Sequence, residues 1–170
     1  MISKDQLALS IKAIAVCGKS NVGKTSSILM AAESIIEHLQ ELYGDVVVDG
    51  PNSYGETNTI DKWYILTVKE KRIAIFARGD DEWSIGRKLE ENKDCDFYIC
   101  TSHLMGKTIN CLTNFFCKNE ILFVNKIGVL NRSIREFDPD YEANKTRIDS
   151  ENKDFANIIT DLFLKYFVVE

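Results

Sequence analysis

The sequence predicts an α/β fold: a three-layer sandwich with helices on both faces of a mostly parallel sheet that contains one antiparallel strand. Short apolar runs alternate with amphipathic stretches of helical length along most of the chain. A glycine-rich segment joins the first apolar run to the first amphipathic stretch. Two strand-like runs, 63–68 and 72–76, lie so close together that they predict a hairpin, which supplies the antiparallel strand. The length of 170 residues fits a single domain, 1–170.

The first predicted elements are a strand at 11–17 and a helix at 26–42. Apolar residues recur at helical spacing in the second segment, giving one buried face: Ile28, Leu29, Ala32, Ile35, Ile36, Leu39 and Leu42. Gly44 is a helix stop signal. A short strand at 46–48 follows, and the turn-forming residues of 49–61 predict a long loop.

The second half of the chain repeats this alternation. Its predicted elements are a helix at 82–92, a strand at 95–100, a helix at 106–118, a strand at 121–124 and a final helix at 150–167. In the first of these helices, Trp83, Ile85 or Gly86, and Leu89 are expected to point inward. The charged residues of 131–150 predict an irregular segment.

Composition excludes several classes of protein. A net charge of −5 argues against a broad nucleic-acid surface, because phosphate backbones need basic stripes. No run approaches the ~20 apolar residues of a membrane span, and 1–5 lacks the apolar core of a signal peptide. The five cysteines form no C-x-x-C pair, and the two histidines lack zinc-ligand spacing. Reduced, buried thiols in a cytoplasmic protein are therefore expected: Cys17, Cys95, Cys100, Cys111 and Cys117.

Residues 18–25 fit G-x-x-x-x-G-K-[ST], the phosphate-binding P-loop, with a strand before it and a helix after it. Backbone N–H groups and the helix dipole form an anion site there, and glycines allow close backbone approach. Lys24 is predicted to reach the β- and γ-phosphates, and the Thr25 hydroxyl to bind Mg²⁺. The predicted nucleotide-binding residues are Gly18, Ser20, Asn21, Val22, Gly23, Lys24, Thr25 and Ser26.

Acidic residues follow the apolar run 73–76 at 80–81. Because ligands bind where the carboxyl ends of parallel strands meet, Asp80 and Asp81 are predicted Mg²⁺ ligands, and Asp80 is a candidate catalytic residue. The acidic residue of this motif usually follows its apolar run directly, whereas Ala77, Arg78 and Gly79 intervene here. The alternative is that one of the two carboxylates caps the next helix.

The segment 101–108 also lies between a predicted strand and helix and ends in Gly-Lys-Thr. Together with Thr101, Ser102 and Lys107, the helix N-terminus is a candidate site for the γ-phosphate or an acceptor group. His103 is the candidate catalytic residue that positions a water or abstracts a proton. The alternative is a capped turn with a surface histidine.

Three further features border the predicted site. Asn125 and Lys126 begin a guanine-reading Asn-Lys-x-Asp box in which Gly128 replaces the Asp, so a plain strand end is the better interpretation. Asp49 ends the predicted strand 46–48, where it could accept a substrate hydroxyl or only cap a turn. The arginines after the last strand are candidate lid residues for phosphates, with a solvated loop as the alternative: Arg132, Arg135 and Arg147.

Residues 18–25, extended by Ser26, resemble the P-loop NTPase superfamily. The amino-acid sequence of this loop is similar to that of translation-factor-related GTPases. Gly79-Asp80 and the run 95–101 resemble small bacterial P-loop proteins of poorly defined function, a likeness that implies nucleotide binding with ATP favoured over GTP.

Three functions follow from these residues. The first is Mg²⁺-dependent nucleoside triphosphate binding with hydrolysis or phosphoryl transfer, using Lys24, Asp80 and His103, and with a small-molecule acceptor. The second is a degenerate GTPase-like switch whose loop 49–61 is read by a protein partner. The third is a regulatory protein whose loop holds only phosphate. Neither a membrane nor nucleic acid is an expected partner.

Overall fold

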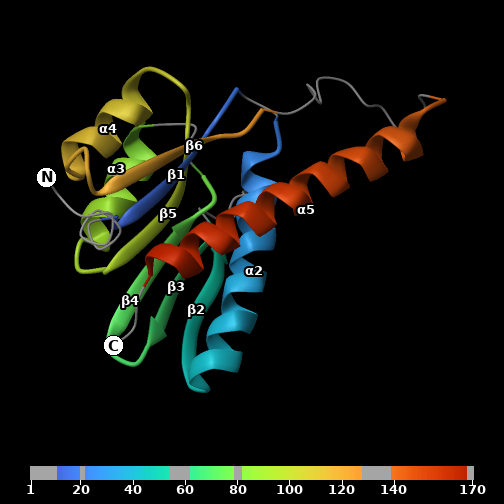
Figure 1. The fold of residues 1–170 in the computed structure, drawn as a ribbon. Helices are drawn as coiled ribbons and strands as arrows, with labels where there is room; N and C mark the ends of the chain where they lie inside the picture. Colours follow the sequence, from blue (N-terminus) through green and yellow to red (C-terminus); the bar gives the residue numbers. More distant parts are fainter. Residues whose placement is uncertain (1–10, 20–21, 54–61, 79–81, 128–138, 168–170) are drawn as a thin grey trace, which may run out of the picture.

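The computed structural model describes residues 11–19, 22–53, 62–78, 82–127 and 139–167. Within them, a six-stranded mixed sheet lies between two layers of helices (Figure 1). The strands are β1 (Ala13–Cys17), β2 (Val46–Ser53), β3 (Lys62–Val68), β4 (Lys71–Phe76), β5 (Phe97–Ser102) and β6 (Ile121–Asn125). The helices are α2 (Lys24–Tyr43), α3 (Glu82–Glu91), α4 (Lys107–Phe115) and α5 (Tyr141–Tyr166).

The strand order is β2-β3-β4-β5-β1-β6. β3 runs antiparallel to β2 and β4, while β4, β5, β1 and β6 pair in parallel. The predicted sheet, mostly parallel with one antiparallel strand, is therefore confirmed, as is the hairpin that supplies that strand. β5 lies between β1 and β4, so the glycine-rich segment after β1 and the residues after β4 leave the sheet two strands apart.

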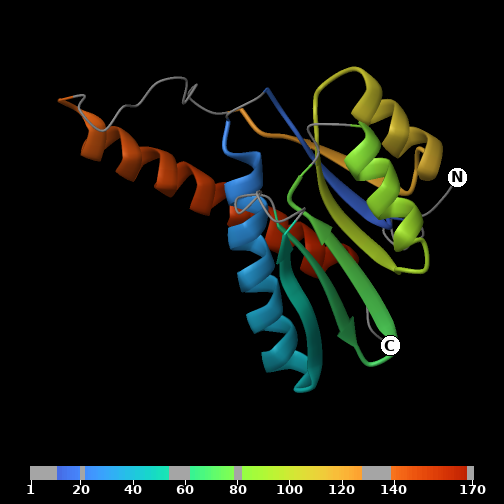
Figure 2. The same cartoon turned by 180° about the vertical axis from the view of Figure 1, so that it is seen from behind.

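Side chains that alternate along each strand build two hydrophobic cores, one on each face of the sheet. α2 and α5 cover one face and α3 and α4 cover the other, which confirms the three layers (Figure 2). In β1, Ile14 and Val16 belong to the α2–α5 core, whereas Ala13 and Ala15 belong to the α3–α4 core. α5 lies across α2, and its N-terminal turns extend beyond the sheet (Figures 1 and 2).

Two predicted element boundaries were wrong. β2 continues through Asp49 to Ser53, where a loop was expected, and its register with β3 shifts between Asp49 and Asn52. Pro51 is tolerated there because it lies within this register shift of an edge strand, where no residue of β3 pairs with it. The final helix begins at Tyr141, nine residues before the predicted start at Ser150, so 141–150 is helical rather than irregular.

Two predicted core residues are exposed. Trp83 is 71% exposed, and the Arg87 guanidinium lies over its ring, 5.3 Å from the centroid. Leu42 is also exposed, in the last turn of α2. The other predicted inward residues of α3, Ile85 and Leu89, are fully buried, so this helix is held by a narrower apolar stripe than the sequence suggested.

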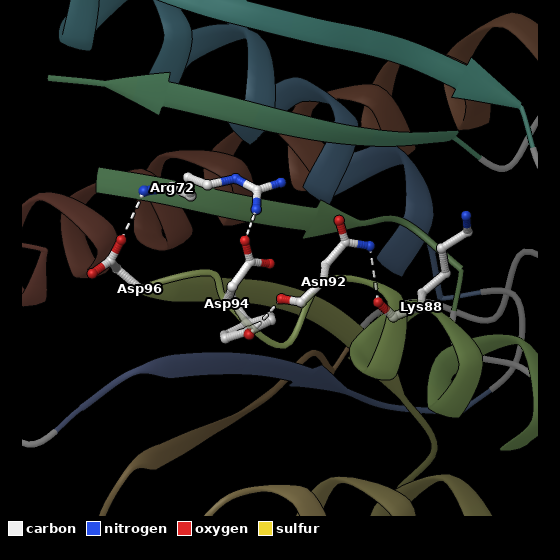
Figure 3. A network of polar contacts seen from close by, with 6 residues as sticks. Arg72, Lys88, Asn92, Asp94 and Asp96 are labelled. Atoms are coloured by element: carbon white, nitrogen blue, oxygen red, sulfur yellow. Dashed lines mark hydrogen bonds and ion pairs between the residues drawn. The ribbon is translucent and has the colours of Figure 1, made fainter. Parts of the chain in front are cut away.

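A network of polar contacts lies at the starts of β4 and β5, at the end of the sheet opposite the glycine-rich segment (Figure 3). The backbone N–H of Arg72 donates to Asp96 over 2.8 Å, and the Arg72 guanidinium pairs with Asp94. The Tyr98 hydroxyl donates to the carbonyl oxygen of Asn92 over 2.7 Å. These contacts tie the start of β4 to the segment between α3 and β5, so the carboxylates at this end of the sheet have structural partners.

Candidate functional site

The glycine loop, residues 18–25, leaves β1 and enters α2, and two of its glycines are packed too closely for a side chain. A Cβ on Gly18 would lie 2.8 Å from the carbonyl oxygen of Lys126. Gly23 has a φ of 79°, and a Cβ there would lie 2.1 Å from Oδ1 of Asn152. The loop therefore depends on glycine at both positions, because of contact at the first and both contact and backbone conformation at the second.

Lys24 begins α2, and its side chain turns back into the glycine loop. The residue is 5% exposed, and Nζ donates to the carbonyl oxygens of Gly18 over 3.1 Å and Lys19 over 2.9 Å. The first turn of α2 contains no acidic residue, and its N-cap, Gly23, provides no side-chain hydrogen bond. The positive end of the helix dipole and the Lys24 ammonium group thus act on the same space, which suits an anion.

The other loop residues predicted to bind nucleotide differ in their surroundings. Val22 is buried, and a Cβ on Gly18 would lie 3.0 Å from its Cγ2, whereas Ser26 is exposed on the first turn of α2. Ser20 and Asn21 lie outside the described residues.

Thr25 connects the glycine loop with the end of β4. Its hydroxyl donates to the carbonyl oxygen of Ala77 over 2.8 Å. Ala77 directly follows β4, at the position where the metal-supporting Asp of the predicted motif would normally stand. The contact reaches past β5, so the glycine loop meets the residues after β4 although β1 and β4 are not neighbours. Asp80 and Asp81 lie outside the described residues.

Thr101 provides an unsatisfied hydroxyl beside the glycine loop. It pairs in register with Val16 of β1 and is 1% exposed. Its side chain lies on the α2–α5 face because β5 alternates and Ile99 belongs to that core. Within the described part of the chain, its Oγ1 has no hydrogen-bond partner. Because such a buried group costs free energy until it is bonded, it marks a place where a ligand or water oxygen would be stabilised.

The turn after β5 is closed by its own side chains. Thr108 Oγ1 accepts hydrogen bonds from the Ser102 hydroxyl over 3.1 Å and from the backbone N–H of His103 over 3.2 Å. These bonds form the capped turn that the sequence offered as the alternative to an anion site. His103 is half-buried and follows the strand next to β1, whereas Lys107 is exposed.

Lys126 follows β6 and is buried behind the glycine loop. Its backbone N–H donates to the carbonyl oxygen of Cys17 over 2.7 Å. Its Nζ donates to Ser27 Oγ and to Asn152 Oδ1, each over 2.6 Å. Burial lowers the pKa of Lys126 from 10.5 to about 8, a shift that the nearby Glu151 partly opposes. Asn125 is exposed. The Asn-Lys pair is thus a structural strand end rather than a base-reading surface.

Sequence reasoning missed this cluster, although one signal for it exists. Asn152 stands one helical turn before Ala156 and two turns before Ile159, on the buried stripe of α5. A polar residue on a buried stripe needs a polar partner, which Lys126 provides.

Two predicted site residues lie elsewhere. Asp49 is in the middle of β2 and pairs with Ile65, so three strands separate it from β1, and it accepts a hydrogen bond from Asn52. The prediction that it ends a strand at the site is therefore wrong. Arg147 is an exposed residue of α5 that donates to Asn144, not part of a loop. Arg132 and Arg135 lie outside the described residues.

Across the described ranges, no group of three or more His, Cys, Asp or Glu residues is placed to hold a metal ion. All five cysteines are free thiols; Cys17, Cys95 and Cys100 are buried as predicted, but Cys117 is exposed. Burial raises the pKa of Cys95 to about 11, which disfavours its thiolate.

In the part of the chain that the structure describes, no helix has the length and apolar character needed to cross a bilayer.

Comparisons of this chain with protein-family models, curated proteins and solved structures find no match. This arrangement offers a helix N-terminus, a buried lysine inside the glycine loop and two hydroxyls, of Thr25 and Thr101, near the ends of β4 and β5.

Proposed function

We propose that this chain is a P-loop protein that binds a nucleoside triphosphate with Mg²⁺ in the glycine loop and hydrolyses or transfers its terminal phosphoryl group. The observation that carries the proposal is the buried Lys24 ammonium group, held inside a loop whose Gly18 and Gly23 admit no side chain. A loop of this kind brings backbone N–H groups within reach of phosphate oxygens.

The metal assignment is supported by oxygen donors at the end of β4. The Thr25 hydroxyl and the Ala77 carbonyl oxygen lie 2.8 Å apart, and hydroxyl and carbonyl oxygens are ligand types that Mg²⁺ accepts. Thr25 would hold the ion, with Asp80 or Asp81 supporting it directly or through water. Bound Mg²⁺ supplies charge neutralisation on the phosphate oxygens.

The remaining chemistry belongs to the chain itself. Lys24 would bind the β- and γ-phosphates and stabilise the negative charge that develops on transfer. The unsatisfied Thr101 hydroxyl can donate a hydrogen bond to an oxygen, or accept one from a donor, at the ends of β4 and β5. His103 would position the nucleophile from the turn after β5.

The preference for ATP over GTP rests on the segment after β6. Lys126 is buried in contacts with Ser27 and Asn152, and Gly128 stands where the guanine-reading Asp would be. Without that carboxylate, the guanine N–H and exocyclic amine have no matched acceptor there.

A thermal-shift panel of ATP, GTP, ADP and GDP with Mg²⁺ tests the proposal. At a ligand concentration 100-fold above Kd, binding adds about 2.7 kcal/mol to the free energy of unfolding. We expect ATP to raise the Tm by several degrees and GTP by less. Absence of a shift with all four nucleotides would overturn nucleotide binding, and a larger shift with GTP would overturn the base preference. A shift with pyrophosphate alone would favour the regulatory, phosphate-holding function.

The Asp80→Asn variant tests the metal role. We expect it to lower Mg²⁺-dependent phosphate release more than it weakens nucleotide binding, because a metal ligand acts on the charge that develops during transfer. Asp94→Asn is the matched control, since Asp94 is an exposed carboxylate at the opposite end of the sheet, paired with Arg72 (Figure 3). Equal loss of turnover and binding by Asp80→Asn, with a lower Tm, would instead indicate a helix cap.

A further inference from the structure

A buried polar cluster lies directly behind the glycine loop and has no role in the proposed phosphate chemistry. It consists of Lys126, Ser27 and Asn152, which are 3%, 0% and 4% exposed. Lys126 Nζ donates to the other two side chains over 2.6 Å each, and Ser27 Oγ lies 3.5 Å from Asn152 Oδ1. The cluster thus joins three elements that are distant in sequence: the end of β6, α2 and α5.

The same cluster supports both close-packed glycines of the loop. The Lys126 carbonyl oxygen occupies the space next to Gly18, and Asn152 Oδ1 occupies the space next to Gly23. The Lys126 ammonium group holds that Oδ1 in place by a hydrogen bond. Lys126 therefore contributes to the packing behind the loop at both Gly18 and Gly23.

We propose that Lys126 is a positioning residue of the phosphate site: its ammonium group holds Asn152 of α5 against Gly23 and places a second positive charge behind the glycine loop. This inference rests on the proposed function, because it requires a polyphosphate in the loop. It adds α5, through Asn152, to the elements that shape the site.

The charges around Lys126 determine how its proton responds to a ligand. Lys24 in α2 borders the same Gly18 position as Lys126, Cys17 precedes the loop in β1, and Glu151 is next to Asn152 in α5. Burial raises the pKa of Cys17, so its thiol stays neutral near pH 8. Because the pKa of Lys126 is about 8, its ammonium group is only partly protonated there.

An anion in the loop favours the protonated form of Lys126, since opposite charges attract. By linkage, binding then takes up protons above about pH 8, and affinity falls as the pH rises through that range. A lysine that only packed against α5 would show neither effect.

Calorimetric titration with Mg²⁺ and ATP at pH 7 and pH 9, in buffers of different ionisation heat, tests this. Between pH 7 and pH 9, the ATP affinity of the wild type should fall about tenfold more than that of Lys126→Met. ATP binding should take up protons near pH 8 in the wild type but not in this variant. Asn152→Ala keeps the charge, so it should keep the proton uptake while losing about three- to tenfold in affinity. Lys153→Met, an exposed change one residue away, is the matched control and should behave as the wild type.

The outcomes separate this inference from the proposed function. Wild-type protein that binds ATP with the same pH profile as Lys126→Met, and without proton uptake, would overturn the positioning role and leave nucleotide binding intact. Absence of ATP binding by the wild type would overturn both. Should Lys126→Met fail to fold, proton uptake by the wild type and the affinity of Asn152→Ala still decide the matter.

Discussion

Replacing Lys24 with alanine should weaken the binding of Mg²⁺–ATP by about 30- to 150-fold. The estimate corresponds to about 2–3 kcal/mol, the contribution of a hydrogen bond to a charged group. Lys24 is the buried cation inside the glycine loop, and its Nζ already lies among carbonyl oxygens of the loop. Removing it takes away the charge that would face the phosphates and also the bonds that hold the loop closed around that position.

Lys19→Ala is the control for this experiment. Lys19 belongs to the same loop but is exposed, so its charge is screened by solvent, and we expect less than about a threefold loss of affinity. Titration calorimetry gives both affinities, and a urea denaturation curve of each free variant shows whether the loop change lowers stability. Unchanged ATP affinity in Lys24→Ala, or equal losses in both variants, would place the phosphate site elsewhere.

Gly23→Ala should lower the free energy of unfolding by about 2–5 kcal/mol and abolish nucleotide binding at micromolar ligand. Two costs combine: a left-handed φ costs a non-glycine residue about 1–2 kcal/mol, and overpacking costs about 1–3 kcal/mol. The second arises because the new Cβ would lie 2.1 Å from Oδ1 of Asn152. Relief of the clash requires α5 or the loop to move.

Gly44→Ala shows the cost of a positive φ without a contact. Gly44 has a φ of 78° and a ψ of −81°, whereas Gly23 has a φ of 79° and a ψ of 25°, and a Cβ on Gly44 would have nothing within 4 Å. Gly44 has the more strained of the two backbone conformations, so a larger loss of stability in Gly23→Ala would come from the contact with α5. In the Gly23→Ala background, Asn152→Ala should cost less than it does in the wild type. Additive losses of stability in the double variant, measured by urea denaturation, would mean that α5 does not press on the loop.

Local sequence patterns predicted the elements whose structure depends on nearby residues. The apolar run before Gly18, the helical spacing after Thr25 and the tight hairpin of β3 and β4 each stand within a short window. Predictions failed where the position of a segment in the folded protein determines its structure. The turn-forming residues Gly50, Pro51 and Asn52 lie in a strand because an edge position tolerates them. The first turns of α5 carry no apolar stripe because they extend past the sheet (Figure 1).

The candidate site divides in the same way. The roles of Gly18, Gly23 and Lys24 were predicted from a contiguous motif, and their packing supports the loop that the motif requires. The cluster of Lys126 and Asn152 was not predicted, because its members meet only when β6 and α5 fold against α2. No pattern within either segment shows that the other lies beside it.

The position of β1 in the sheet affects how the protein can fold during translation. β1 pairs only with β5 and β6 among the described strands, and both are encoded far downstream of it, whereas β2, β3 and β4 pair with near neighbours in the chain. During translation, β1 must therefore wait without a partner until the segment ending at Ser102 leaves the ribosome. Asn152, which closes the wall behind Gly23, emerges later still. A nascent chain that stalls before that residue has its glycine motif complete in sequence but not yet enclosed in structure.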